Sequence, residues 1–163
     1  GNGRKCDARI ADNIKALFEA AKREGLSLYL CSPYRDLDRQ NMLFDKKIKN
    51  YMGRGMSYAE AYIKVATAVT VPGCSEHQVG LAFDITSTTY TVLDSGFGNT
   101  DEGKWLEENC ARFGFILRYP KGKERITGIE YEPWHFRYVG EEAAAVIMEK
   151  GITLEEFWEE YLK

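Results

Sequence analysis

The chain has 163 residues, which fits a single domain, residues 1–163, built around one hydrophobic core. Its formal charge of −3 and pI of about 5.5 exclude the strongly basic surface typical of nucleic-acid-binding proteins. No apolar run approaches the roughly 20 residues that a membrane-spanning helix needs. The chain begins Gly1-Asn2-Gly3 without Met, as expected of a processed or engineered end, and a membrane contact would depend on an anchor outside this sequence.

The first half of the sequence predicts three helices and a strand. Apolar residues recur at helical spacing over 7–23, and Gly25 then favours a stop. The apolar segment 26–31 predicts a buried strand. Two more helices follow: one is capped by Asp36, runs through Ile48 and ends at Gly53 and Gly55, and the other begins at a Ser57–Glu60 capping box and covers 58 to about 69.

The second half mixes short strands with helices. The pattern predicts a loop over 71–80, a strand over 81–86, strand and loop over 88–99, a helix over 101–113, a strand over 115–117, an exposed polar turn over 118–128, a strand or extended segment over 129–137, and helices over 141–150 and 153–161. Glutamates crowd the last helix and favour a solvated face. Because no regular strand–helix–strand rhythm appears, we expect an α+β fold with a small antiparallel sheet flanked by helices.

The four cysteines are widely spaced and form no Cys-x-x-Cys pair, which argues against a structural zinc knuckle. They are Cys6, Cys31, Cys74 and Cys110. Buried thiols with at most one disulfide is the expectation, and the sequence does not choose among the three complete pairings of four cysteines.

Histidine is rare, and both histidines lie close to a carboxylate. His77 precedes Asp84 by seven positions, and His135 follows Glu132 by three. A catalytic zinc takes three protein ligands and keeps one position open, so two imidazoles and one aspartate match that count. Taken singly, each residue is ordinary: a core or surface histidine, a capping aspartate, a solvated glutamate. The ligand types alone therefore leave the metal site and these ordinary roles open.

Glu132 is the candidate general base if zinc is bound. A catalytic zinc lowers the pKa of its water toward about 7. A free carboxylate close by could accept the proton and later pass it to the leaving amine. The spacing alone does not show that Glu132 and His135 reach the same metal ion.

At these residues the sequence resembles the VanY-type D-Ala-D-Ala carboxypeptidases, within the wider group that includes D-Ala-D-Ala dipeptidases, L,D-carboxypeptidases and the hedgehog-like fold. The resemblance covers about residues 28–140 and rests on three separated motifs in the expected order. These are a Tyr-Arg pair followed by Gln (Tyr34, Arg35, Gln40), Ser-x-His-x-x-Gly-x-Ala-x-Asp (Ser75, His77, Gly80, Ala82, Asp84) and Glu-x-x-His (Glu132, Pro133, Trp134, His135). The segment 114–120 is also similar to the family.

The resemblance implies a role for each motif residue. His77, Asp84 and His135 would bind Zn²⁺, and Glu132 would be the catalytic base. Arg35 would lie near the scissile bond, where a guanidinium suits an oxyanion or a substrate carboxylate. Three further residues are expected to help bind substrate, each with a plain structural alternative: Ser75 (a loop hydrogen bond), Gln40 (a solvent-facing helix residue) and Trp134 (core packing).

The function implied is a zinc carboxypeptidase that removes the terminal D-Ala from peptidoglycan stem peptides. D,D-cleavage is favoured, and L,D-cleavage is the nearest alternative. A peptidoglycan endopeptidase, a D-Ala-D-Ala dipeptidase, and a non-catalytic cell-wall-binding domain on the same fold remain open. The implied location is extracytoplasmic, secreted or anchored at the cell envelope. The sequence does not choose between a role in antibiotic resistance and routine wall maturation.

Overall fold

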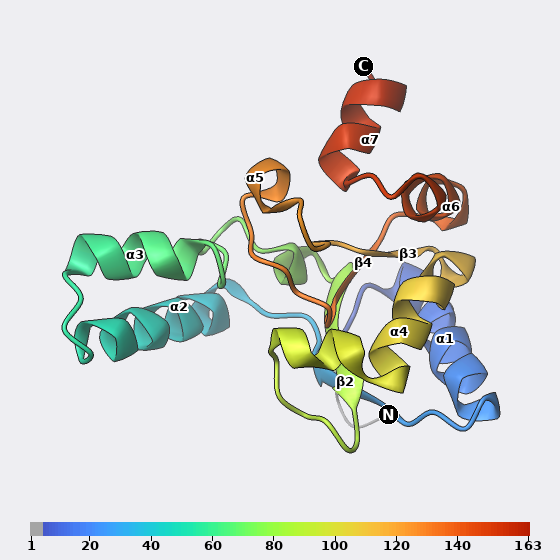
Figure 1. The fold of residues 1–163 in the computed structure, drawn as a ribbon, viewed down its shortest axis with the longest axis horizontal. Coiled ribbons are helices and arrows are strands. Elements are labelled where there is room, and N and C mark those ends of the chain that lie inside the picture. The colour runs from blue at the N-terminus through green and yellow to red at the C-terminus, as the bar shows by residue number, and fades with distance from the viewer. Residues whose placement is uncertain (1–4) are drawn as a thin grey trace.

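The computed structural model describes residues 5–163, and a four-stranded sheet lies at its centre (Figure 1). The strand order is β1-β2-β4-β3, and every neighbouring pair is antiparallel. The strands are β1 (Leu28–Ser32), β2 (Ala82–Ser87), β3 (Phe115–Leu117) and β4 (His135–Tyr138). Helices flank this small sheet, so the predicted α+β architecture is confirmed.

The helices of the described residues fall into α-helices and short 3₁₀ turns. The α-helices are α1 (Ala11–Arg23), α2 (Leu37–Met52), α3 (Tyr58–Ala66), α4 (Asp101–Asn109), α5 (Glu124–Thr127), α6 (Glu141–Lys150) and α7 (Leu154–Tyr161). The 3₁₀ turns are η1 (Ala8–Ile10), η2 (Glu76–Val79), η3 (Ser95–Asn99) and η4 (Cys110–Phe113).

The main core lies between one face of the sheet and helices α1 and α4. Successive strand residues point to opposite faces, and Phe83 and Ile85 of β2 point into this core with Phe136 of β4. Leu17 of α1 and Leu106 of α4 close it from the helix side, both fully buried. The alternate residues of the same two strands therefore point to the other face of the sheet.

Two smaller apolar clusters hold the remaining helices. At the C-terminal end, Ile147 of α6 and Phe157 of α7 pack with Ile116 of β3. Helices α2 and α3 form a hairpin that projects away from the sheet (Figure 1). It has its own core, made of Phe44, Ile48, Ala61 and Val65.

Several predicted boundaries are wrong, for local reasons. The predicted helix over 7–23 begins as the 3₁₀ turn η1, because the Asp7 side chain accepts a hydrogen bond from the Arg9 backbone nitrogen and so caps that turn. The predicted helix over 101–113 ends as the 3₁₀ turn η4. Helix α3 ends at Ala66 instead of about 69. Segment 88–99 contains η3 and no strand.

The predicted extended segment over 129–137 is strand only from His135, because Glu132 to His135 forms a tight turn. The polar stretch 118–128 contains the short helix α5. It is not wholly exposed, since Arg118 at its start is buried.

None of the four cysteines, all within residues 5–163, is in a disulfide, and Cys110 is buried. Burial raises the pKa of the Cys110 thiol to about 12, so it is an unreactive apolar group. No helix among residues 5–163 is both long enough and apolar enough to cross a bilayer.

Candidate active site

Sheet register brings Asp84 and His135 together. The two residues are direct partners on the antiparallel strands β2 and β4. Directly opposite residues on one face of an antiparallel pair have Cβ atoms about 5 Å apart. Asp84 lies between Phe83 and Ile85, whose side chains point into the main core, so the Asp84 carboxylate points to the opposite face. The 51 positions that separate the two residues in sequence are thus closed by strand pairing.

The 3₁₀ turn η2 presents His77 to the same face. Gly80 follows the turn at φ +72°, a left-handed conformation that glycine adopts without strain. An added Cβ at Gly80 would also lie 2.9 Å from the backbone nitrogen of Asp7, which donates to the Gly80 carbonyl. The glycine of the motif therefore serves both the turn and its contact with the N-terminal segment.

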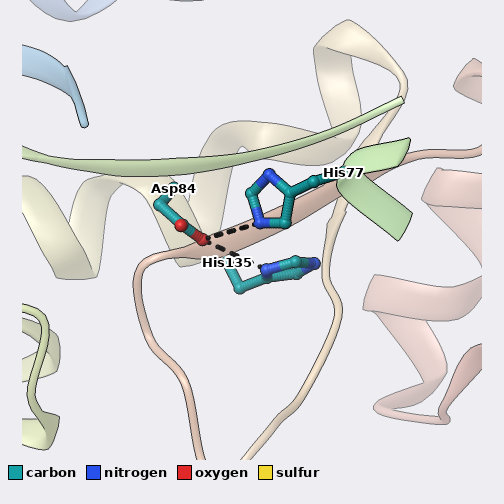
Figure 2. Close-up of side chains that lie close together, drawn as sticks. All are labelled: His77, Asp84 and His135. Atoms are coloured by element: carbon teal, nitrogen blue, oxygen red, sulfur yellow. Dashed lines mark hydrogen bonds and ion pairs between the residues drawn. The ribbon is translucent and has the colours of Figure 1, made fainter. Parts of the chain in front are cut away.

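The three predicted ligands converge in one buried cluster (Figure 2). His77 Nε2 lies 3.3 Å from Asp84 Oδ1, and His135 Nδ1 lies 3.2 Å from the same oxygen. Among the described residues this is the one group of histidine, cysteine and carboxylate side chains arranged to hold a metal ion. Ligand atoms about 2.0–2.1 Å from a tetrahedral ion lie about 3.3 Å apart, so both spacings suit zinc.

The hydrogen bonds of His77 define which ring nitrogen carries a proton. Nδ1 lies 3.0 Å from the Pro33 carbonyl, an acceptor, so Nδ1 donates. Nε2 lies 2.8 Å from Nη2 of Arg35, a donor, so Nε2 accepts. The lone pair of Nε2 therefore faces the cluster, as a metal-binding imidazole requires. Burial lowers the pKa of His77, which also favours the neutral ring.

His135 is held by carboxylates on both sides. Nδ1 faces Asp84, and Nε2 lies 3.5 Å from Oε2 of Glu76. Burial alone lowers the pKa of His135, but the hydrogen bonds to Asp84 and Glu76 outweigh it and raise the pKa to about 9. A carboxylate behind a histidine is the usual way in which proteins orient a metal-binding imidazole.

Glu76 was not singled out from the sequence, although it lies beside His77 in the motif. Its carboxylate also accepts from Arg118 Nε at 2.8 Å and lies 3.1 Å from Arg137 Nη1. Burial raises the pKa of Glu76, but His135 and the two arginines outweigh it and lower the pKa to about 2. The position of Glu76 in sequence could have suggested it, whereas nothing in the sequence pairs it with Arg118.

A tight turn places Glu132 beside the cluster. The His135 backbone nitrogen donates to the Glu132 carbonyl, and Pro133 occupies the second position of the turn, where proline is favoured. Glu132 Oε2 then lies 3.8 Å from His135 Nδ1. Burial and the nearby Asp84 carboxylate raise the pKa of Glu132 to about 8, against the lowering effect of His135 and Arg35. A carboxyl group tuned toward neutral pH suits proton transfer.

Arg35 reaches into the cluster from the loop before α2. Its Nη2 donates to Asp84 Oδ2 at 2.8 Å, and Nη1 donates to Gln40 Oε1 at 3.0 Å. Gln40 is fully buried, and its amide nitrogen donates to the Thr70 carbonyl. The alternative that Gln40 is a solvent-facing helix residue is therefore wrong, and its contact with Arg35 makes it a support for the guanidinium.

The cluster forms the inner part of a pocket with a volume of about 650 Å³. The pocket is lined by the metal-ligand candidates, by Glu132 and Arg35, and by Ser75 and Trp134. Both of these last residues are buried. Trp134 also belongs to the main core, as its structural alternative predicts, and its part in substrate binding stays a prediction. Gln40 lies behind Arg35 and does not line the pocket.

The fold and the cluster define an α+β protein with a buried His–Asp–His group that can hold a metal ion at the inner end of a pocket. The chain matches the model of the VanY D-alanyl-D-alanine carboxypeptidase family over residues 3–141. It belongs to this family, as the motifs predicted. It is 47% identical over 154 residues to YodJ of Bacillus subtilis (strain 168), covering 94% of this chain and 53% of that protein.

A D-alanyl-D-alanine carboxypeptidase of Enterococcus faecalis (strain ATCC 700802 / V583) is 43% identical over 158 residues, covering 96% of this chain and 56% of that protein. The chain thus spans about half the length of these curated relatives.

Solved structures with the same fold include two complexes with ligands. VanYB in complex with D-alanine-D-alanine has a TM-score of 0.91 at 42% identity, covering 99% of this chain and 86% of that one. A mutant of the D,D-pentapeptidase VanY in complex with Zn(II) has a TM-score of 0.87 at 42% identity, covering 96% and 85%. The L,D-carboxypeptidase LdcB has a TM-score of 0.82 at 46% identity, covering 94% and 68%.

Proposed function

We propose that this chain is a zinc-dependent carboxypeptidase that removes the terminal D-Ala from peptidoglycan stem peptides, with D,D-cleavage as the favoured specificity. One observation supports this proposal above all. His77, Asp84 and His135 converge, and the carboxyl group of Glu132, which is not one of the ligand candidates, lies beside them. The Zn(II) and D-alanine-D-alanine complexes of its structural relatives support the cofactor and the substrate class. Zinc supplies a Lewis acid that activates water and polarises the scissile carbonyl.

The protein side chains transfer the proton, neutralise charge and position the substrate. Glu132 accepts a proton from the attacking water and returns it to the leaving amine. Arg35 offers a guanidinium at the same point, where it can neutralise negative charge that develops on the scissile carbonyl or is carried by the substrate. Ser75 and Trp134 line the pocket, and this position would let them contact the substrate. The buried Gln40 holds Arg35 in place.

The cleaved bond distinguishes the alternatives. D,D-carboxypeptidases shorten a pentapeptide stem, L,D-carboxypeptidases shorten a tetrapeptide, endopeptidases cut within the stem, and dipeptidases require free D-Ala-D-Ala. The similarity to both VanYB and LdcB supports the terminal D-Ala as the leaving group. Digestion of defined pentapeptide and tetrapeptide muropeptides, followed by mass analysis, tests this. Loss of one alanine from the pentapeptide is expected, and release of internal fragments alone would refute the proposal.

A non-catalytic wall-binding domain is the alternative from another class of function. Binding does not require a buried carboxyl group poised beside a metal site, so Glu132 favours the enzyme. We also propose an extracytoplasmic location, since cross-linked peptidoglycan is assembled outside the cytoplasmic membrane. Fractionation of cells that produce the full-length protein tests the location, and its recovery in the cytosolic fraction would contradict it.

A further inference from the structure

The pocket continues away from the metal cluster along helix α2. This outer part, named here the basic arm, is lined by Arg39, Leu43, Lys46, Lys47, Asn50, Tyr51 and Arg54. Residues 39 and 50 are about 16 Å apart along the helix at 1.5 Å per residue. That length accommodates about five residues of an extended peptide. The basic arm is thus long enough to contact substrate residues well upstream of the bond that is cut.

Helix α2 presents cations, but none of its acidic residues, to the pocket. The pocket-lining residues at positions 39, 43, 46, 47 and 50 recur three, four or seven positions apart, which places them on one side of the helix. Arg39, Lys46 and Lys47 are the cations among them, and Arg54 adds a fourth just beyond the end of α2 at Met52. The acidic residues of the same helix, Asp38 and Asp45, do not line the pocket. The arm is therefore strongly cationic, although the whole chain carries a formal charge of −3.

None of these four cations forms an ion pair with another of residues 5–163. Two of them make weak contacts: the Arg54 guanidinium lies 5.9 Å from the centre of the Tyr51 ring, and Arg39 Nη1 lies 3.8 Å from Met42 Sδ. Apart from Asp84 and Glu132 at the candidate active site, Glu130 is the one carboxylate among the described residues that lines the pocket. The four cations of the arm outnumber this carboxylate, so the described residues that line the outer pocket do not neutralise its positive charge.

We infer that the basic arm binds free carboxylates on residues upstream of the scissile bond, so that the preferred substrate is an acidic peptide. This inference rests on the proposed function and specifies its substrate class. Lys46 and Lys47 are the residues best placed to carry it, since they lie at the middle of the arm. The His77, Asp84 and His135 group binds the C-terminal end of the peptide, where the bond is cleaved, and the basic arm adds affinity for the residues upstream.

Two peptides that differ in one group test the inference. Acetyl-Glu-Lys(acetyl)-D-Ala-D-Ala carries one upstream carboxylate, and acetyl-Gln-Lys(acetyl)-D-Ala-D-Ala carries none. The parent enzyme is expected to favour the Glu peptide by about threefold to tenfold in kcat/KM, through KM, the range expected of two exposed charge pairs. Raising the ionic strength from about 0.05 M to about 0.5 M should reduce this preference, because salt screens exposed charges.

The matched variants are Lys46→Gln/Lys47→Gln and Lys22→Gln/Lys49→Gln. Both remove two positive charges, but Lys22 and Lys49 are exposed and do not line the pocket. Only the first variant should lose the preference for the Glu peptide. Equal cleavage of both peptides by the parent, or a preference that survives in Lys46→Gln/Lys47→Gln, would overturn the inference and leave the proposed function standing. Failure to cleave either peptide would instead count against the proposed function.

Discussion

At the scale of single residues, the site separates atoms that can hold a metal ion from an atom that can move a proton. His77 Nε2, His135 Nδ1 and the Asp84 carboxylate face one another, whereas Glu132 stands beside them at 3.8 Å from His135. Burial and the imidazoles act in opposite directions on Asp84, and the imidazoles of His77 and His135 hold the pKa of Asp84 well below its usual range. The aspartate is therefore anionic, as a zinc ligand must be.

Replacing Glu132 with Gln should abolish hydrolysis while keeping the metal site. We expect kcat to fall by about 10²- to 10⁴-fold, the usual contribution of a general base, because the amide cannot accept a proton. Zinc content, measured by atomic emission after dialysis, should equal that of the parent. The matched control is Glu124→Gln, an exposed residue of α5, which should leave both measurements unchanged. Turnover of Glu132→Gln at the parental rate would remove Glu132 from the mechanism.

Replacing Glu76 with Gln should weaken zinc binding without removing a ligand. Glu76 accepts a hydrogen bond from His135, and loss of such a support typically costs about 10- to 100-fold in metal affinity. Competition with a chromogenic chelator measures the effect. Glu155→Gln is the comparison, since Glu155 pairs with Arg118 but does not contact His135. If Glu76→Gln and the parent bind zinc equally well, Glu76 does not orient His135.

At the scale of elements, antiparallel pairing and two turns assemble the site. Strand register places Asp84 opposite His135, η2 adds His77, and the turn before β4 returns Glu132 to the cluster. Helix α7 is joined to the same region, since Arg118 pairs with both Glu76 and Glu155. The glutamate-rich face predicted to be solvated thus includes a residue that anchors its helix.

Gly80 tests the importance of the turn. Gly80→Ala should destabilise the protein by about 1–3 kcal/mol through its positive φ, and further through the contact of the new Cβ with the Asp7 backbone at 2.9 Å. Gly73→Ala is the control, because Gly73 has φ +93° but open space around its Cβ position. Urea unfolding should show the larger loss of stability for Gly80→Ala. Equal losses would mean that the Asp7 contact has no effect.

The sequence predicted the candidate ligands and base of the site better than the residues that hold them in place. The ligand candidates and Glu132 fall in spaced motifs, and the resemblance of these motifs to a known family, not the residue types alone, selected them. Glu76 and Arg118 are 42 positions apart, and their ion pair depends on β3 and β4 lying side by side, which no local pattern reveals. The short strand β4 was predicted too long for a similar reason, since the turn at Glu132 depends on a single backbone hydrogen bond.

At the scale of the whole molecule, the metal cluster links segments from separate parts of the chain. The loop before α2, the turn η2 and strands β2 and β4 all contribute a side chain to it. A ligand that binds only the folded state stabilises it, by about 2.7 kcal/mol at a concentration 100 times its Kd. For a protein of this size that corresponds to a rise in Tm of roughly 5–10 °C.

Zinc should therefore raise the Tm of the metal-free protein, and EDTA should reverse the rise. Differential scanning calorimetry with and without excess zinc measures it. His135→Ala is the control, since it lacks one ligand and should lose most of the shift. An equal zinc-dependent shift in His135→Ala would indicate that the stabilising ion binds elsewhere.

The most direct test is an anomalous difference map at the zinc absorption edge from a crystal of the zinc-loaded protein. We expect one dominant peak about 2.0–2.2 Å from His77 Nε2, His135 Nδ1 and a carboxylate oxygen of Asp84. A dominant peak at any other set of side chains, or imidazoles of residues 77 and 135 turned away from a common ion, would contradict this expectation.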